Sequence, residues 1–280
     1  MSLFEKIIFA LQKTMPTPKP FGWFHLLMLG IMFGAILSLA MIKKHHSEKQ
    51  LKIVLGVYGI VALILELLKQ IVWSFNYDPV FNVVTWDYQW YAAPFQLCTT
   101  PIYVSLIIML MKKSKLRDML SSYLAFTTIL GSIATIFIPD SCFVDTILVN
   151  IHTTWLHYGS FVVSIYLMMT REVGSTFKDL INGIFVFLFF VGLASILNVS
   201  IYQANVLNGE TFNMFYISPY FISELPVFDI IQQNTPYALF LLIYIIALSV
   251  GSAIVWTIMR GVRKIRQMRL AHNDTCLLHS

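Results

Sequence analysis

The chain has 280 residues, of which 58% are hydrophobic and only 12% are charged. A soluble fold needs far more polar surface than this, so the composition excludes a soluble domain and predicts an all-α membrane protein. The formal net charge of +5 is typical of some nucleic-acid-binding proteins, but here the basic residues lie where anionic lipid headgroups would meet them. We therefore expect membrane lipids, and no nucleic acid, as partners.

The chain begins with a short amphipathic segment. Its apolar side chains recur at helical spacing, at Leu3, Phe4, Ile7, Ile8 and Leu11. The run is too short and too charged for a cleavable signal peptide, and no small-residue cleavage pattern precedes Pro16. We expect residues 1–20 to lie on the outer membrane surface, with a helix from Ser2 to Lys13.

Seven apolar segments follow, and each is long enough to cross about 30 Å of hydrocarbon. They cover residues 21–42, 51–75, 93–111, 118–139, 147–170, 177–200 and 236–259. The sequence therefore predicts a single integral membrane domain, a polytopic bundle of seven transmembrane helices over residues 21–260. A basic tail over residues 261–280 follows it.

Lysine and arginine gather at alternate connections of this bundle. The four groups are Lys43, Lys44, Lys49 and Lys52; Lys112, Lys113, Lys115 and Arg117; Arg171 and Lys178; and Arg260, Arg263, Lys264, Arg266 and Arg269. By the positive-inside rule these groups face the cytoplasm, although Lys6, Lys13 and Lys19 favour the opposite orientation. We expect the amino terminus outside, the carboxyl terminus in the cytoplasm, and a multi-pass protein of the cell membrane.

Two outer connections are rich in aromatic residues. The longer, from Ile201 to Pro236, carries Tyr202, Phe212, Phe215, Tyr216, Tyr220, Phe221 and Phe228, and the shorter, from Asn76 to Pro94, carries Trp86, Tyr88, Trp90 and Tyr91. So aromatic a loop is not expected to be fully solvated. The longer one either folds over the outer mouth of the bundle as a lid or forms part of an aromatic belt at the interface.

Polar groups inside apolar spans are the first candidates for function, because each is costly in lipid unless it is paired or hydrated. Glu66 and Lys69 are three residues apart and share one helical face. Glu66, Cys98 and His157 each lie fourteen residues from a cytoplasmic basic residue. At about 1.5 Å per residue, all three would sit roughly 21 Å above the inner boundary. The sequence therefore predicts one site in the outer half of the membrane.

A carboxylate, a thiol and an imidazole at one level are the parts of an acyl-transfer site. His157 would take the proton of Cys98 and make the sulfur a useful nucleophile. A second lipid hydroxyl would then attack the thioester, with His157 as general base. Donors near Gln96, Thr99 and Thr100 are candidates for stabilising the oxyanion.

These residues also have structural interpretations. Cys98 is either a small apolar packing residue or one half of a disulfide with Cys142 in an oxidising compartment. Glu66 and Lys69 are either part of the site or a buried ion pair that fixes helix packing. His157 is either a base or a hydrogen-bonded packing residue or proton relay.

A metal centre would have to combine His152, His157, Asp145 and a cysteine. This set has no recognisable ligand spacing. We therefore expect no metal and no cofactor.

Three stretches resemble the transmembrane protein 164 family. The run from His157 to Leu167 (HYGSFVVSIYL) is similar to its histidine helix, and Glu66 to Gln70 (ELLKQ) to the acidic-then-basic signature of its second span. Pro94 to Cys98 (PFQLC) resembles the Pro-hydrophobic-Cys opening of the bacterial YwaF-type integral membrane proteins of the same group. The resemblance covers spans two to five and, by topology, most of the chain.

This resemblance implies an acyltransferase-like membrane fold. Cys98 and His157 match the cysteine and histidine credited with acyl transfer to lysophospholipids in the animal members. In those members the cysteine adjoins its proline, whereas here three residues separate Pro94 from Cys98.

The sequence thus predicts a membrane-embedded acyltransferase that acts on phospholipid or lysophospholipid acyl chains through Cys98, His157 and a thioester intermediate. The supporting residues are Glu66, Lys69, Gln96 and Thr99. One alternative is a non-enzymatic transporter or ligand-binding membrane protein that uses Glu66, Lys69 and His157. Another is a structural membrane subunit. A receptor is disfavoured, because the third span is not followed by Asp-Arg-Tyr and the seventh contains no Asn-Pro-x-x-Tyr.

Overall fold

The computed structural model describes residues 1–43, 46–139 and 142–278, without the side chains of residues 270–278. Lys44, a member of the first basic group, lies outside the described residues. The helices are α1 (Leu3–Leu11), α2 (Trp23–Ile42), α3 (Glu48–Ser74), α4 (Thr100–Leu110), α5 (Lys115–Phe126), α6 (Thr128–Phe137), α7 (Ile147–Met169), α8 (Phe177–Gln203), α9 (Phe228–Asn234) and α10 (Tyr237–Leu278). Two short strands, β1 (Phe75–Asp78) and β2 (Val83–Trp86), complete the fold.

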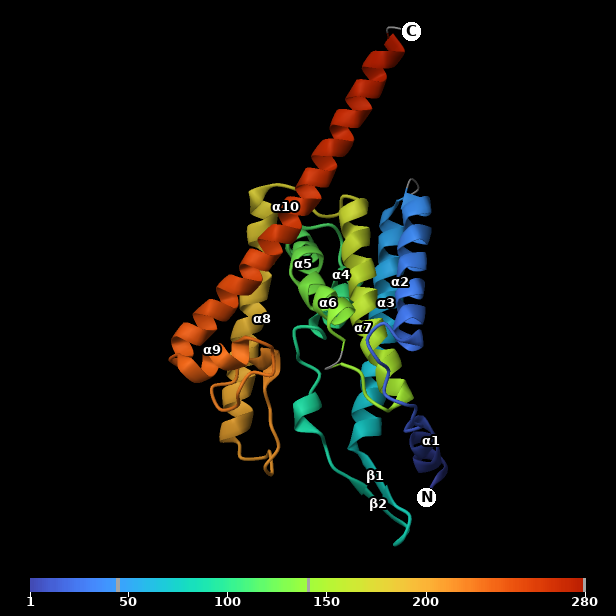
Figure 1. The fold of residues 1–280 in the computed structure, drawn as a ribbon, viewed down its shortest axis with the longest axis vertical. Coiled ribbons are helices and arrows are strands. Elements are labelled where there is room, and N and C mark those ends of the chain that lie inside the picture. The colour runs from blue at the N-terminus through green and yellow to red at the C-terminus, as the bar shows by residue number, and fades with distance from the viewer. Residues whose placement is uncertain (44–45, 140–141, 279–280) are drawn as a thin grey trace.

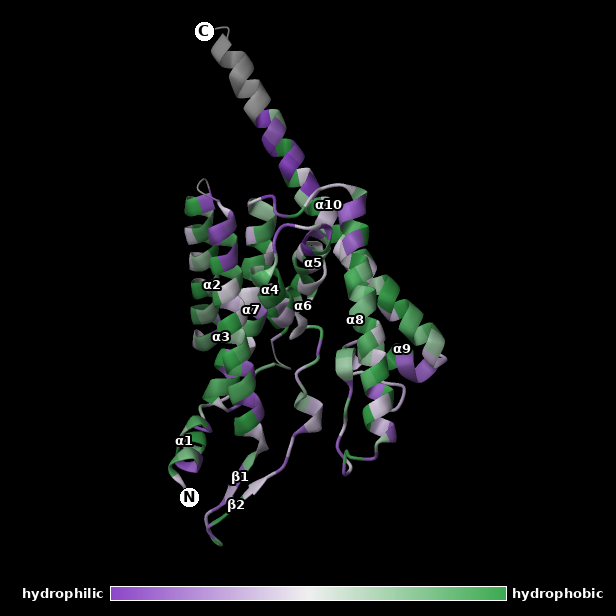
Figure 2. Cartoon of the chain, turned by 180° about the vertical axis from the view of Figure 1, so that it is seen from behind, coloured by the Kyte–Doolittle hydropathy of each residue, from purple (hydrophilic) through white to green (hydrophobic). Residues whose placement is uncertain are grey.

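The long helices run side by side as a bundle (Figure 1). α7 is its central member and packs against α2, α3, α5 and α6. α3 also packs on α4, and α5 on α8. The two ends of the chain lie at opposite ends of the molecule, and the last part of α10 projects beyond the other helices (Figure 1). Hydrophobic residues cover the middle of the bundle, while hydrophilic residues gather at the starts of α3 and α8 and on the projecting part of α10 (Figure 2).

Within the described residues, five helical segments are long and apolar enough to cross a membrane. They are Trp23–Ile42, Glu48–Ser74, Lys115–Phe137, Phe177–Gln203 and Tyr237–Arg269. α7 has 23 residues but is not among them, because Asn150, His152 and His157 lower its mean hydropathy. α4 has only 11 residues. The membrane class is therefore supported, whereas seven crossings and the orientation of the termini stay predictions.

The third apolar segment is not helical throughout, contrary to the expectation of a span over residues 93–111. α4 begins only at Thr100, and Pro101 lies in its first turn. Proline has no amide hydrogen, so it is tolerated in the first turn of a helix but not further inside. Pro101 therefore fixes the start of α4. The residues before Thr100 form an irregular segment. Non-helical backbone at membrane depth needs protein partners, and one of these is Tyr103, whose hydroxyl donates to the Pro94 carbonyl at 2.5 Å.

The fourth apolar segment is divided at Thr127 into α5 and α6. The Leu124 carbonyl accepts hydrogen bonds from the Thr128 hydroxyl at 2.9 Å and from the Ser164 hydroxyl at 2.6 Å. Side-chain donors that enter the carbonyl ladder bend helices. Thr127 in turn contacts α10, where its hydroxyl lies 3.0 Å from that of Ser252. The single helix that we predicted here is therefore two.

A small hairpin follows α3 and was not predicted by the all-α interpretation. β1 and β2 pair antiparallel, with Phe75 opposite Trp86. Asp78 Oδ1 accepts from the amides of Val80 at 2.8 Å and Phe81 at 3.1 Å. An aspartate that bonds the amides after it, with Pro79 between, is a turn signal that reverses the chain.

The predicted amphipathic helix is present as α1. Ser2 and Glu5 form a capping box at its start. Ile8 packs with Val72 and Phe75 at the end of α3. The Gln12 amide continues this contact by donating to the Val72 carbonyl at 2.9 Å and the Phe75 carbonyl at 2.7 Å. α1 is therefore fixed to the same end of the bundle as the hairpin.

The aromatic connection between α8 and α9 packs into the bundle. Met214, Phe215 and Ile217 are fully buried and belong to the main hydrophobic cluster. Phe215 has a φ of 59°, in the left-handed region that favours glycine. The Gln96 amide stabilises this backbone, since its Oε1 accepts from the Phe215 amide at 2.7 Å and its Nε2 donates to the Asn213 carbonyl at 2.9 Å. The prediction that this loop is not fully solvated is confirmed.

Candidate functional site

A buried ion pair with a third member from another helix lies at the end of the bundle near the hairpin. Glu66 and Lys69 are 1% and 7% exposed, and Lys69 Nζ lies 2.7 Å from Glu66 Oε1. His152 of α7 is 4% exposed, and its Nε2 donates to Glu66 Oε2 at 2.7 Å. Both carboxylate oxygens are therefore engaged, as a buried charge requires. The predicted Glu66–Lys69 pair is present, and His152 completes it.

This charged group holds the irregular backbone that precedes α4. The Ala92 carbonyl accepts from Lys69 Nζ at 3.0 Å and from Gln70 Nε2 at 2.6 Å. Gln70 Nε2 also donates to Glu66 Oε1 at 2.7 Å. The Glu66 carboxylate also acts on Tyr88, in the connection that leads to α4. Burial raises the pKa of the Tyr88 phenol, and the negative charge of Glu66 raises it further. The ion pair thus positions the approach to Cys98.

His152 is the residue that sequence reasoning missed as part of this group, having considered it only as a metal ligand. Its Nδ1 is buried and has no hydrogen-bond partner among the described residues. A signal for it was available. One lysine does not satisfy both oxygens of a buried carboxylate, so a second basic residue on a neighbouring helix was to be expected, and His152 is of that type.

Cys98 lies two residues before α4 and is partly exposed. Its sulfur interacts electrostatically with the Cys142 thiol, the Lys69 ammonium and the Glu66 carboxylate. Cys98 therefore lies within electrostatic range of the ion pair on α3, while a shared functional site at one membrane depth stays a prediction.

Gln96 and Thr99 shape the turn that carries Cys98. The Thr99 hydroxyl donates to the Gln96 carbonyl at 2.9 Å and accepts from the Gln96 amide at 2.9 Å. The Gln96 side chain is occupied by the Asn213 and Phe215 backbone. In this structure both residues therefore support the backbone around the thiol.

His157 lies on α7 and faces α6. Its Nδ1 is 3.1 Å from the Thr135 hydroxyl, which in turn is 4.0 Å from Cys142 Sγ. No hydrogen bond joins Cys98 to His157, both of which are described residues. The structure therefore links His157 to Cys142 through Thr135, and Cys142 to Cys98 through electrostatic interaction.

The geometry also bears on two alternatives, a disulfide between Cys98 and Cys142 and a metal centre. Cys98 and Cys142 are not joined by a disulfide in the described part of the chain. Among the same residues, no group of three or more His, Cys, Asp or Glu side chains is arranged to hold a metal ion.

Comparison with protein families gave a match that covers most of the chain. The model of the TMEM164 family matches residues 20–260. Neither the curated proteins nor the solved structures gave a match.

Proposed function

This chain belongs to the TMEM164 family, and we propose that it is a membrane-embedded acyltransferase with Cys98 as nucleophile and His157 as general base. Its donors and acceptors would be phospholipids and lysophospholipids. A family match over most of the chain supports the membrane setting, and the reaction is inferred from the residues of the cluster.

In the proposed reaction, the Cys98 sulfur attacks the ester carbonyl of a phospholipid and its proton passes to His157. The carbon–oxygen ester bond breaks, and the proton goes to the departing oxygen, which leaves a lysophospholipid and an acyl thioester. The hydroxyl of a second lysophospholipid then attacks the thioester, with its proton taken by His157. The carbon–sulfur bond breaks, and the proton returns to the sulfur.

The observation that carries this proposal is the electrostatic cluster around Cys98. Of the two charges that act on the Cys98 sulfur, the Lys69 ammonium favours a developing thiolate and the Glu66 carboxylate opposes it. The hydrogen bond from His152 holds the second oxygen of the Glu66 carboxylate. His157 does not bond Cys98 here, but catalytic hydrogen bonds are often absent without substrate.

We also propose seven crossings of the cell membrane, with the amino terminus outside. The chain ends lie at opposite ends of the bundle (Figure 1), which supports an odd number of crossings. The positive-inside rule supports the orientation. Labelling of single cysteines placed in the hairpin and in the tail of intact cells, with a reagent that does not cross membranes, tests both points. Labelling of the hairpin position alone is expected.

The test of catalysis uses the full-length protein in nanodiscs that contain phosphatidylcholine with deuterated acyl chains. Unlabelled lysophosphatidylcholine is added, and deuterated product and intact protein mass are measured together. Wild-type protein should transfer label and show an acyl adduct. Cys98→Ser should lose both, and His157→Asn should slow transfer about a hundredfold or more.

Cys142→Ser is the matched control, because it removes the second thiol of the same cluster and should leave transfer active. If Cys98→Ser transfers label as well as wild type, the covalent proposal is wrong. The transporter or ligand-binding alternative is favoured by one observation: His152 Nδ1, within a buried charged group, has no hydrogen-bond partner in the described parts of the chain. It would gain support if wild type showed no transfer and Glu66→Gln abolished uptake or binding of a polar solute.

A further inference from the structure

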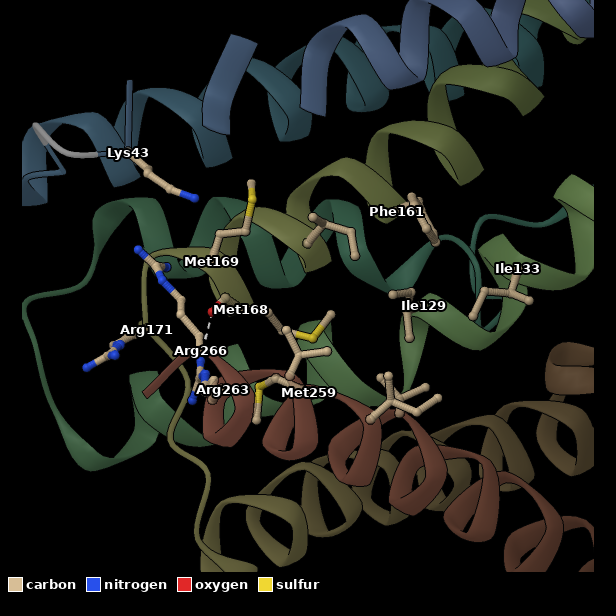
Figure 3. A pocket seen from close by; sticks show the side chains of 14 residues that line it. Lys43, Ile129, Ile133, Phe161, Met168, Met169, Arg171, Met259, Arg263 and Arg266 are labelled. Atoms are coloured by element: carbon tan, nitrogen blue, oxygen red, sulfur yellow. Dashed lines mark hydrogen bonds between the residues drawn. The ribbon is translucent and has the colours of Figure 1, made fainter. Parts of the chain in front are cut away.

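A separate pocket lies at the opposite, basic end of the bundle, between α6, α7 and α10. It has a volume of about 580 Å³, within the usual range for a ligand site. Figure 3 shows its side chains, with basic groups at one end and apolar groups at the other. None of the residues of the Cys98 cluster lines it.

The mouth of this pocket is a group of four cations. They are Lys43, Arg171, Arg263 and Arg266. Within the residues that the structure describes, none of the four forms a salt bridge, and no acidic side chain lines the pocket. Arg171 repels Arg263, and Asp179 offsets part of this repulsion. The mouth therefore keeps a net positive charge that an anion would neutralise.

One of these cations is fixed in place by the backbone. Arg263 donates to the Val173 carbonyl at 3.0 Å and to the Met168 carbonyl at 2.8 Å. It thereby ties α10 to the end of α7. Arg171 and Arg266 are exposed, and in Figure 3 their guanidinium groups lie close to the same mouth. Two exposed cations beside a fixed one suit a phosphate group.

The walls beyond the mouth are apolar. Met259, Phe161 and Ile133 line the pocket from the basic end into the bundle (Figure 3). A free anion would leave this surface without a partner, whereas an acyl chain would cover it. The charge and the walls together select a ligand with an anionic head and a hydrocarbon tail.

We propose that this pocket binds one anionic phospholipid from the membrane leaflet at the basic end of the bundle, which the positive-inside rule predicts to be cytoplasmic. Its phosphate lies among Arg171, Arg263 and Arg266, and one acyl chain lies between α6, α7 and α10. The lipid adds a contact between α10 and α7 to the one that Arg263 makes.

This lipid is not the substrate of the proposed acyl transfer. Arg171 and His157 are fourteen residues apart, or about 21 Å along α7 at 1.5 Å per residue. The ester bonds of a phospholipid lie close to its phosphate, so an ester held at Arg171 does not reach Cys98 or His157. The inference therefore stands or falls independently of the catalytic proposal.

The test uses full-length protein that has been delipidated in a mild, uncharged detergent. Binding is measured by native mass spectrometry, and the thermal unfolding temperature is followed in parallel. The added probes are dioleoyl phosphatidylglycerol, dioleoyl phosphatidylcholine and glycerol 3-phosphate. Only phosphatidylglycerol should bind at low ratios and raise the unfolding temperature, because only it has both the charge and the tails.

Variants locate the site. Arg171→Gln and Arg266→Gln should each weaken phosphatidylglycerol binding about fivefold, the effect expected for one basic residue at a lipid surface. Lys264→Gln is the matched control for Arg266→Gln, since it removes the same charge from α10 but does not line the pocket. Ile133→Trp keeps all four cations and fills the apolar end, and it should also weaken binding.

Four results would overturn the proposal. Equal weakening by Lys264→Gln would mean that the basic end attracts anionic lipid without a site. Equal binding of phosphatidylcholine would reduce the pocket to an apolar groove. Binding of glycerol 3-phosphate as tight as that of phosphatidylglycerol, or unchanged lipid binding in Ile133→Trp, would reduce it to an anion site.

Discussion

Two groups of buried charges stand at opposite ends of this bundle, and they are built differently. At the basic end, Arg117 is 1% exposed and lies between two carboxylates, with Nη1 at 2.6 Å from Glu48 Oε1 and Nη2 at 3.1 Å from Glu172 Oε2. Glu172 also accepts from His46 Nε2 at 2.6 Å, and His46 Nδ1 lies 3.0 Å from the Tyr166 hydroxyl. Each of these groups has a partner.

At the other end, Glu66 has a partner for each oxygen, but the group is not closed. His152 Nδ1 has no partner among the described residues, and the Cys98 thiol lies within electrostatic range of the pair. A fully paired network fixes structure, whereas a buried polar group with unused capacity is available for chemistry. The comparison therefore favours a structural role for the Arg117 group and agrees with the proposed functional role of the Glu66 group.

The largest effect on stability is expected from Arg117→Met. It leaves the Glu172 carboxylate, whose side chain is only 16% exposed, without its guanidinium partner, which should cost about 3 kcal/mol of unfolding free energy. Thermal unfolding of the detergent-solubilised protein measures this, with exposed Lys113→Met as control. Acyl transfer per folded molecule should be unchanged. A loss of acyl transfer without a loss of stability would contradict a purely structural role for the Arg117 group.

The second prediction places one substitution at both ends of α3. Glu66→Gln leaves Lys69 as a buried cation without its counter-charge and should cost about 2 kcal/mol. Glu48→Gln should cost less than about 1 kcal/mol, because the Glu48 side chain is 49% exposed and water screens it. Chemical denaturation of the two variants side by side gives the difference. Equal costs would contradict the claim that only Glu66 is in a desolvated site.

The third prediction concerns the packing behind the site. A Cβ on Gly159 would meet the Tyr58 ring at 2.8 Å, and the Tyr58 hydroxyl donates to the Leu156 carbonyl at 3.1 Å. Gly159→Ala should therefore destabilise by about 1 to 2 kcal/mol through overpacking.

Gly192→Ala on α8 is its control. Nothing lies within 4 Å of the added Cβ there, and alanine favours a helix over glycine by up to about 1 kcal/mol. The two variants should shift the unfolding temperature in opposite directions. A neutral Gly159→Ala would show that Tyr58 moves freely.

The smallest change is expected for His152→Gln. The glutamine amide can still donate to Glu66, and the substitution removes the buried nitrogen that lacks a partner, so the unfolding free energy should change by less than about 1 kcal/mol. Thermal unfolding is the measurement. A loss above about 2 kcal/mol would mean that Nδ1 makes an interaction essential to the fold, and the Glu66 group would then resemble the Arg117 group.

One contact of the candidate site, the Glu66–Lys69 pair, was predicted before the structure, and the rest could not be, for physical reasons. The Glu66–Lys69 pair followed from a spacing of three on one helix. The start of α4 at Thr100 could have been read from Pro101, whose lack of an amide hydrogen confines it to a first turn. The link from Glu66 to His152 spans 86 residues of sequence, and no local pattern specifies it.

The sequence by itself determined the membrane class, the amphipathic first helix and the apolar segments, because these depend on composition and periodicity. Only the tertiary structure decided which partners meet. It joined His157 to Thr135, Gln96 to the buried loop at Phe215 and Glu66 to His152. Such contacts depend on the rotation and tilt of each helix against its neighbours, which packing of the whole bundle sets and which helical periodicity leaves open.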